Sequence, residues 1–316
     1  MNTAQTSLPH ISFIVPLYNE ASNLASFVTQ LIDYLQNLAI GYEIILIDDG
    51  SRDNSVGIAR QLCQQPNIKL IALSRNFGKE LALTAGLEYC TGDAAIMIDA
   101  DFQHPFATIA TFIEKWQSGY EIVYGVRQDR NQESWLKRGM IRFFYHILSM
   151  LTAPQIPRDA GDFRLLDRKV ITALNNCQER VRFMKGLYAW VGFKSLAIPF
   201  EVQARHHGQS RWGFSHLAEL AIVGITSFSN IPLRIWSLVG LSISFIAFIY
   251  ASYIILKTLI FGVDVPGYAS ILVGITFFGG IQLLSIGILG EYIARIFNEV
   301  KQRPKYIVTE KIGFSE

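Results

Sequence analysis

The sequence has few charged residues for its length. Only 17% of the 316 residues are charged, whereas 50% are hydrophobic, and the mean hydropathy is +0.27. A composition this apolar is unusual for a wholly soluble enzyme. The net charge of +2 argues against nucleic acid as a partner, because duplex binding needs many Lys and Arg side chains on one face. We therefore expect one catalytic domain and a smaller, apolar part.

Cysteine is also scarce. Cys63, Cys90 and Cys177 lie far apart, without the CxxC or Cys/His spacing of a zinc site. This pattern fits reduced thiols in a cytosolic domain better than a disulfide framework. We expect no signal peptide, because the apolar run from Ile11 to Leu17 is short, lacks a basic flank and ends in a loop containing proline.

The hydrophobic residues are concentrated towards the C-terminal end. No charged residue occurs from Ile235 to Leu256 or from Val265 to Gly290. Each run is long enough to cross a hydrocarbon core of about 30 Å, so we expect two membrane-spanning helices. Two buried helices of a soluble protein are the alternative, although such helices rarely stay uncharged over this length.

Basic residues flank these runs unevenly. Arg234 precedes the first run and only Lys257 lies between the two, whereas a basic tail follows the second: Arg295, Lys301, Arg303, Lys305 and Lys311. The positive-inside bias places the domain and both termini in the cytoplasm, as in a multi-pass protein of the inner (plasma) membrane. Two amphipathic stretches, Ser134–Thr152 and Trp212–Phe228, suit helices lying in the headgroup layer, with ordinary packing helices as the alternative.

Residues 11–125 alternate β-rich runs with helical stretches. The expected strands are 11–15, 42–47, 68–74, 94–98 and 121–124, and the expected helices are 23–38, 55–63, 79–89 and 106–117. This alternation predicts an α/β domain with a mostly parallel sheet covered on both faces. In such sheets ligands bind beyond the carboxyl ends of the strands, so we expect the site in the loops that follow them.

Polar residues follow each of the first four expected strands. The four loops are Pro16-Leu17-Tyr18-Asn19-Glu20, Asp48-Asp49-Gly50-Ser51, Arg75-Asn76-Phe77-Gly78-Lys79 and Asp99-Ala100-Asp101-Phe102-Gln103. The i, i+2 spacing lets both carboxylates of Asp99 and Asp101 approach one hard cation, and Mg²⁺ or Mn²⁺ commonly bridges such carboxylates to substrate phosphates. A lone DxD also occurs as a turn or helix cap, but the three other polar strand ends favour a metal site.

Two of these loops have a simpler explanation as well. Asp48 and Asp49 are either ligand-binding residues or helix-capping acids. Lys79 begins a helix, where a cation is disfavoured by the helix dipole. A bound pyrophosphate would explain this position, and a solvated lysine is the alternative.

Together these loops resemble those of family 2 glycosyltransferases with the Rossmann-like GT-A fold. Three later motifs narrow the resemblance: Gly125-Val126-Arg127, Asp159-Ala160-Gly161-Asp162-Phe163-Arg164-Leu165 and Arg205-His206-His207-Gly208-Gln209-Ser210-Arg211. They are similar to the polyprenyl-phosphate branch, which includes dolichyl-phosphate mannose synthases and, with two C-terminal spans, bacterial bactoprenol (undecaprenyl-phosphate) glucosyltransferases. The resemblance covers almost the whole chain. Two positions depart from it: Arg211 stands where Lys is usual, and Gln209 where Glu is common.

The resemblance implies inverting transfer of a hexose, with glucose from UDP-glucose favoured, to undecaprenyl phosphate. The product would serve as a sugar donor for cell-surface glycan modification. The implied organisation is a nucleotide-sugar-binding GT-A core (1–133), an acceptor-side part with interfacial helices (134–232), two transmembrane helices (233–296) and a cytoplasmic basic tail (297–316).

The motifs and their chemistry, together with the resemblance, suggest roles for the site residues. The implied nucleotide-sugar-binding residues are Pro16, Tyr18, Glu20, Asp48, Asp49, Lys79, Asp99, Gln103 and Arg211. The implied catalytic residues are Asp101, Asp159, Asp162 and Arg127, the acceptor phosphate residues are Arg127, Arg138 and Ser210, and the metal ligands are Asp99 and Asp101. Arg127 and Arg138 are alternatively surface residues, and Asp159 and Asp162 alternatively have a structural role.

The expected spans carry few polar side chains, with Gln282 the most conspicuous. A translocation path would carry ionisable groups, so we expect an anchor, a separate flippase and a downstream glycosyltransferase. Glycines in the second span favour a homo-oligomer, for example a tetramer. One rival is a processive polysaccharide synthase, but Gln209-Ser210-Arg211-Trp212 is one residue short of QxxRW. The other is a non-catalytic scaffold that binds nucleotide-sugar or lipid, against which the complete set of charged strand ends argues.

Overall fold

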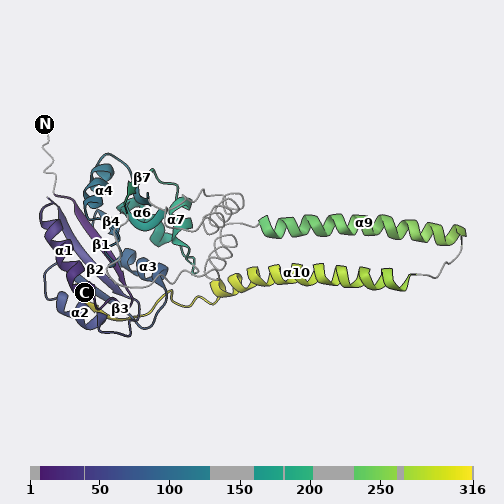
Figure 1. Cartoon of the computed structure of the whole chain (residues 1–316), viewed down its shortest axis with the longest axis horizontal. Helices are drawn as coiled ribbons and strands as arrows, with labels where there is room; N and C mark the ends of the chain where they lie inside the picture. The colour runs from purple at the N-terminus through teal and green to yellow at the C-terminus, as the bar shows by residue number, and fades with distance from the viewer. Residues whose placement is uncertain are drawn as a thin grey trace.

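The computed structural model describes residues 8–38, 40–128, 160–180, 182–201, 231–261 and 267–314. An eight-stranded sheet forms the body of the described domain, and two long helices leave one end of it side by side (Figure 1). The strands are β1 (His10–Leu17), β2 (Gly41–Asp48), β3 (Ile68–Leu73), β4 (Ala94–Met97), β5 (Ile122–Arg127), β6 (Ala160–Asp167), β7 (Ser195–Phe200) and β8 (Val308–Ile312). The helices are α1 (Leu24–Gln36), α2 (Ser55–Leu62), α3 (Lys79–Tyr89), α4 (Ala107–Gln117), α6 (Arg168–Asn176), α7 (Met184–Trp190), α9 (Ile231–Phe261) and α10 (Tyr268–Val300).

The sheet is mixed and mostly parallel. Its strand order is β7-β5-β6-β4-β1-β2-β3-β8. The β4-β1-β2-β3 block is parallel, β7 is parallel to β5, β6 is antiparallel to both of its neighbours, and β8 is antiparallel to β3. The predicted α/β domain and its elements between residues 11 and 124 are confirmed, with boundaries that move by a few residues.

Each face of the sheet is buried under helices, which explains why the central strands are apolar almost throughout. Along β1, Phe13 and Val15 join the cluster under α1, α2 and α4, whereas Ile14 joins the cluster under α3, α6 and α7. Successive side chains of a strand point to opposite faces, so both sets must be apolar. Because both faces of the sheet are covered, we expect a ligand site in the loops at the ends of the strands.

The two long helices differ from the domain in what they expose. α9 and α10 contain 31 and 33 residues, and large apolar side chains along both are exposed, for example Phe248 and Leu283 at 72% each. Within the described residues one stretch, Phe277–Val300 of α10, is long and apolar enough to cross a membrane. The apolar stretch described in α9, Ile235–Tyr250, is shorter. This differs from the sequence-based expectation of two qualifying spans.

Two other expectations concern regions next to these helices. The amphipathic stretches Ser134–Thr152 and Trp212–Phe228 lie outside the described residues. The expected basic tail, 297–316, contains strand β8, an element that the sequence pattern did not predict. The chain therefore returns from α10 to the sheet and ends beside α2 and β3 (Figure 1).

Candidate active site at the carboxyl ends of the strands

The loops after β2 and β3 are joined through the carboxylate of Asp49. Its Oδ1 accepts a hydrogen bond from the Phe77 backbone N–H at 2.7 Å, and its Oδ2 accepts one from the Gly78 N–H at 2.9 Å. Burial raises the pKa of Asp49, whereas these two hydrogen bonds act in the opposite direction. The contact makes the two loops one unit at the end of the sheet.

Gly50 permits this close approach. Its φ is +68°, and a Cβ atom would lie 2.3 Å from the Arg75 carbonyl carbon and 2.5 Å from the Asn76 nitrogen. Both the left-handed backbone and the lack of room require glycine here. The neighbouring Asp48 is 1% exposed, and its Oδ2 accepts a hydrogen bond from the Ser51 N–H at 3.0 Å. Its Oδ1 has no hydrogen-bond partner within the described part of the chain.

The loop after β1 is tied to the same unit. Asn19, in the left-handed region at φ 57°, donates its N–H to Ser51 Oγ at 3.0 Å. Glu20 donates its N–H to Ser55 Oγ at 2.9 Å, and its Oε2 accepts from Asn23 Nδ2 at 3.1 Å. Pro16 lies in β1 and Tyr18 directly after it, both half-buried. The first three predicted loops therefore lie together at the carboxyl ends of β1, β2 and β3.

A lysine links the fourth loop to β6. Lys79 Nζ lies 2.7 and 2.8 Å from the two oxygens of Asp99 and 2.9 Å from Asp162 Oδ2. Burial opposes the charged form of Asp99, but Lys79 and His104 outweigh it and hold the pKa of Asp99 well below its usual range. Burial likewise opposes the charge of Lys79, and Asp162 and Asp99 raise the pKa of Lys79 above its usual range. All three groups are ionised at neutral pH.

This pairing accounts for Lys79 at the start of α3. The ammonium has three donor positions, and the three short contacts use all of them. Two carboxylates so close together would repel each other without a cation between them. Lys79 is therefore neither a merely solvated lysine nor positioned solely for an incoming phosphate.

A second group of residues surrounds Asp101. Asp101 is 9% exposed, and its Oδ1 accepts a hydrogen bond from the Gln103 N–H at 3.1 Å. Gln103 Oε1 in turn accepts a hydrogen bond from Arg127 Nη2, at 3.4 Å, from the end of β5. Three residues with different predicted roles therefore form one chain of contacts.

The carboxylates of the site offer few ligands to a metal ion. No group of three or more His, Cys, Asp or Glu within the described residues is arranged to hold one. Asp99 already faces Lys79 through both oxygens. Mg²⁺ and Mn²⁺ need few protein ligands when substrate phosphates supply the others, so a single carboxylate at Asp101 fits such an ion. The assignment of Asp99 and Asp101 as ligands stays a prediction.

Two residues near this cluster, His104 and Glu80, were not predicted from the sequence. His104 Nε2 lies 3.6 Å from Asp99 Oδ2, and its ring stacks on Phe163 at 4.6 Å between centroids. Glu80 Oε2 accepts a hydrogen bond from the Met184 N–H at 3.0 Å. Burial, reinforced by Asp162, raises the pKa of Glu80 to about 7. His104 follows Gln103 directly, and Glu80 follows Lys79, so adjacency to the motifs was the available signal.

A buried arginine supports the strand that carries Asp162. Arg164 is 3% exposed, its Nη2 donates to the Gly161 carbonyl at 2.5 Å, and its guanidinium lies 3.7 Å from the ring centroid of Tyr188. Arg164 therefore joins β6 to α7. The remaining predicted site residues, Asp159, Arg138, Ser210 and Arg211, lie outside the described residues.

Comparison with known proteins gives this site its context. The family described as Glycosyl transferase family 2 matches residues 12–174, which include the loops after β1, β2, β3 and β4 and Asp162. The chain belongs to this family. The resemblance stated from the motifs is thereby confirmed, and the protein is a glycosyltransferase by family.

Several relatives of this glycosyltransferase match along its length. An uncharacterized glycosyltransferase, sll0501, of Synechocystis sp. is 47% identical over 307 residues, 96% of each chain. The prophage-derived bactoprenol glucosyl transferase of Shigella flexneri is 42% identical, over 94% of this chain and 97% of its own. A prophage bactoprenol glucosyl transferase homolog of Escherichia coli is 43% identical, over 94% and 98%.

Solved structures are less similar to this glycosyltransferase. Glucosyl-3-phosphoglycerate synthase from Mycobacterium tuberculosis, in complex with Mn²⁺, uridine-diphosphate and phosphoglyceric acid, aligns with 69% of this chain and 76% of its own. Its sequence identity is 18% and the TM-score is 0.48. The relatives matched by sequence are therefore the basis of the functional proposal.

Proposed function

We propose that this protein transfers glucose from UDP-glucose to undecaprenyl phosphate, with inversion at the anomeric carbon. The observation that carries the proposal is the similarity, over 94% of the chain, to proteins named bactoprenol glucosyl transferases. The cluster of ionised groups at the strand ends supports a site for an anionic donor. The product would be a lipid-linked sugar donor used in glycan modification at the cell surface.

The charges of the described site favour a divalent cation. Lys79 is already paired with Asp99 and Asp162, and Arg127 contacts Gln103. A divalent cation at Asp101 would supply further positive charge for a diphosphate. We propose that Asp101 holds Mg²⁺ or Mn²⁺, with the diphosphate supplying other ligands; when bound, the ion stabilises the leaving nucleoside diphosphate.

The donor would lie across the joined strand-end loops. Asp48 has an unpartnered, buried acceptor oxygen in the described structure, which suits a donor group of the nucleotide. Asp49 and Gly50 hold the loop that contains Arg75 in place. Pro16, Tyr18, Glu20 and Gln103 complete the proposed donor site, and Arg211, outside the described residues, remains part of the proposal.

The acceptor requires less assistance. A phosphate monoester has a second pKa near 6, so its oxygen is largely ionised at neutral pH and needs no strong general base. Arg127, at the end of β5, offers a planar fork of donors for this phosphate, with Arg138 and Ser210 as further proposed partners. Asp162, and Asp159 beside it in sequence, would orient the acceptor.

We also propose that both long helices cross the bilayer. β7 and β8 belong to one sheet, so the chain lies on the same side of the membrane at these two strands, of which one precedes α9 and the other follows α10. A crossing by α10 alone is incompatible with this, because the number of crossings must be even. α9 is adjacent to α10 and exposes apolar side chains along its length, which supports it as the second span.

This arrangement gives the proposed enzyme its place in the cell. The basic residues after α10 support a position of the domain on the cytoplasmic face of the inner membrane. Transfer to the opposite leaflet and onto the final glycan would require a flippase and a second glycosyltransferase. Five glycines of α10 have open space around them and would permit close association of protomers: Gly274, Gly279, Gly280, Gly287 and Gly290.

A transfer assay tests the proposal. Purified protein in vesicles containing undecaprenyl phosphate is given radiolabelled UDP-glucose with Mg²⁺ or Mn²⁺, and label is followed into the lipid extract. We expect transfer that EDTA abolishes, and a loss of about 100-fold or more in Asp101→Ala. Other nucleotide-sugars serve as the comparison panel. Elongating polymer would indicate a processive synthase, and nucleotide-sugar binding without transfer would indicate a scaffold.

A further inference from the structure

We infer that residues 299–312 form a strap between α10 and the sheet. The strap keeps the carboxyl ends of the parallel strands facing the bilayer, at a fixed distance from the end of α10. The inference rests on the proposed function, because it takes α10 to cross the membrane and the acceptor to lie in it. The strap is anchored to the domain at its beginning, middle and end. The first two anchors share the segment between α6 and α7, and the third involves β3 and α2.

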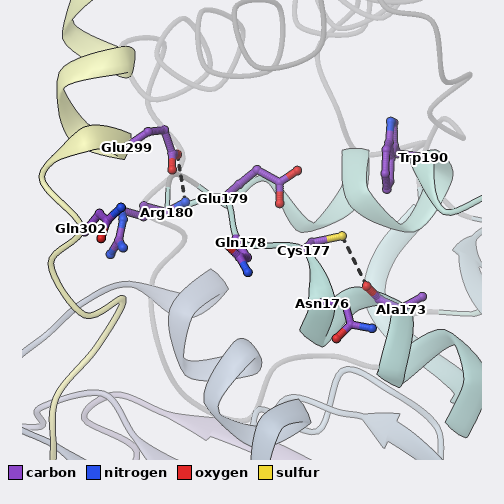
Figure 2. Close-up of a pocket in the computed structure, with 9 residues that line it drawn as sticks. All are labelled: Ala173, Asn176, Cys177, Gln178, Glu179, Arg180, Trp190, Glu299 and Gln302. Carbon is purple, nitrogen blue, oxygen red and sulfur yellow. Dashed lines mark hydrogen bonds between the residues drawn. The ribbon is translucent and has the colours of Figure 1, made fainter.

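The first anchor is at the end of α10. Glu299 Oε1 accepts a hydrogen bond from the Arg180 backbone N–H at 2.9 Å, in the segment between α6 and α7 (Figure 2). Glu299, Gln302 and Trp190 line an open hollow of about 700 Å³ there. Trp190 is 60% exposed, as expected for an aromatic ring at the headgroup layer. The helix therefore meets the domain on a surface suited to the bilayer interface.

The second anchor fastens the connection that follows α10. Lys305 Nζ donates a hydrogen bond to the Cys177 carbonyl at 3.1 Å, just after α6. Tyr306 Oη donates to Glu88 Oε2 of α3 at 2.5 Å. α3 and α6 cover the same face of the sheet, so residues 301–307 run along that face of the domain.

The third anchor is β8, which completes the sheet. Its register with β3 runs from Leu73 opposite Val308 to Leu70 opposite Ile312. Arg60 of α2 binds both carboxylate oxygens of Glu310, at 2.8 to 3.1 Å. The strap therefore ends in a strand fixed by backbone hydrogen bonds and by an ion pair.

The strap reaches the sheet next to the loop after β3, which belongs to the proposed UDP-glucose site. Ser74, directly after β3, donates its N–H to the Ile307 carbonyl at 2.9 Å, and the loop that leads to Lys79 starts at the next residue. Residues 301–307 connect α10 to β8 and can span at most about 25 Å when fully extended. Ile307, which accepts the hydrogen bond from Ser74, therefore cannot lie farther than about this from the end of α10.

Such a restraint matters because donor and acceptor reach the site from different phases. The sugar arrives from water, whereas the lipid phosphate stays at the depth of the headgroups. Misplacement of reacting groups by about 1 Å can reduce a rate by about 100-fold. A strap of fixed length would keep the two substrates in reach of each other, and would be irrelevant to an acceptor that is free in water.

Lengthening the strap tests this function. Gly-Ser-Gly-Ser is inserted between Gln302 and Arg303 of the full chain, and the same insertion before Gly267, between α9 and α10, is the matched control. Each protein in vesicles is assayed with undecaprenyl phosphate in the bilayer and with a short-chain, water-soluble polyprenyl phosphate. We expect the strap insertion to lower kcat/KM about tenfold or more for the bilayer acceptor and less than about twofold for the soluble one. The control insertion should change neither.

A charge exchange gives an independent test of the third anchor. Arg60→Glu and Glu310→Arg should each reduce transfer to the bilayer acceptor selectively, and the double exchange should restore it. Unchanged transfer to the bilayer acceptor by the lengthened strap would overturn the inference. Equal losses with both acceptors would also overturn it, since the strap would then act on the catalytic domain itself. Absence of transfer by the unmodified protein to either acceptor would instead contradict the proposed function.

Discussion

At the scale of single residues, Gly50 offers a controlled test of the donor loops. Alanine there combines a left-handed backbone with a Cβ atom 2.3 Å from the Arg75 carbonyl carbon. Gly119 has φ +94°, and a Cβ atom there would have nothing within 4 Å, so Gly119→Ala carries the backbone strain alone, of order 1 kcal/mol. We expect Gly50→Ala to weaken UDP-glucose binding about tenfold by separating the loops after β2 and β3.

Binding titration and thermal unfolding of the two alanine variants separate these effects. Both variants should lose stability from the strained backbone, whereas only Gly50→Ala should lose affinity for the donor. If the two variants bind UDP-glucose equally well, the contact between these loops does not shape the donor site.

Glu80 predicts a pH dependence of stability. Its pKa is about 7 in the folded protein, above its ordinary value, so the folded state holds this proton more tightly than the unfolded state does. The resulting stabilisation is complete below about pH 4.5 and disappears as the pH rises through about 7. Glu80→Gln removes this dependence. Relative to the unmodified protein, the variant should therefore gain stability as the pH is raised from 5 to 8.

The measurement is thermal unfolding in detergent at a series of pH values. Glu114→Gln is the matched control, because Glu114 is exposed and its partner Lys115 is its immediate neighbour. A constant difference in melting temperature between Glu80→Gln and the unmodified protein across this range would contradict the prediction.

The acidic part of the site could be anticipated from sequence, and its pairings could not. Asp99 and Asp101 follow an apolar strand, which is a local pattern. By contrast, Lys79 meets Asp162 only because β6 inserts beside β4, and no local pattern specifies that strand order. His104 was missed for a similar reason, since its contact with Phe163 depends on the same insertion.

At the scale of elements, the two proposed spans predict a specific topology. Gly267 precedes α10 and has an extended backbone, with φ 179°, which a cysteine also adopts. We expect Gly267→Cys to react with a membrane-impermeant maleimide added outside spheroplasts. Gln65→Cys, exposed between α2 and β3, should react only after lysis. Protection of Gly267→Cys in intact spheroplasts would show that the two helices do not form an outside hairpin.

The elements that sequence reasoning found and those that it missed differ in composition. The central strands are nearly continuous apolar runs, because both faces of the sheet are covered. β8 contains the adjacent charged residues Glu310 and Lys311, as befits an edge strand, and β6 contains the buried Arg164. β7 includes Pro199, which lies in the edge strand opposite Val126. β6 and β8 thus lack a long apolar run, and the apolar run of β7 is interrupted by Pro199. The place of all three strands in the sheet is set by partners distant in sequence.

At the scale of the whole molecule, the proposed anchor changes how the enzyme meets its acceptor. A lipid phosphate remains in the bilayer, so an enzyme held at the membrane surface searches in two dimensions and encounters the acceptor at high local concentration. The exposed apolar surfaces of α9 and α10 would then face lipid, whereas the domain keeps its own buried core. On this proposal, anchoring and catalysis use separate parts of the chain.

The pairing of β8 with β3 has a consequence for how the protein is made. Thr309, which donates a hydrogen bond to the Ala72 carbonyl, follows it by 237 residues. At about 5–20 residues per second, the ribosome needs roughly 12–47 s to add this stretch. During that time β3 has an unpaired edge, a template for association with other strands. The sheet can be closed only after α9 and α10 have been synthesised, so a nascent chain completes this domain last, when both long helices already exist.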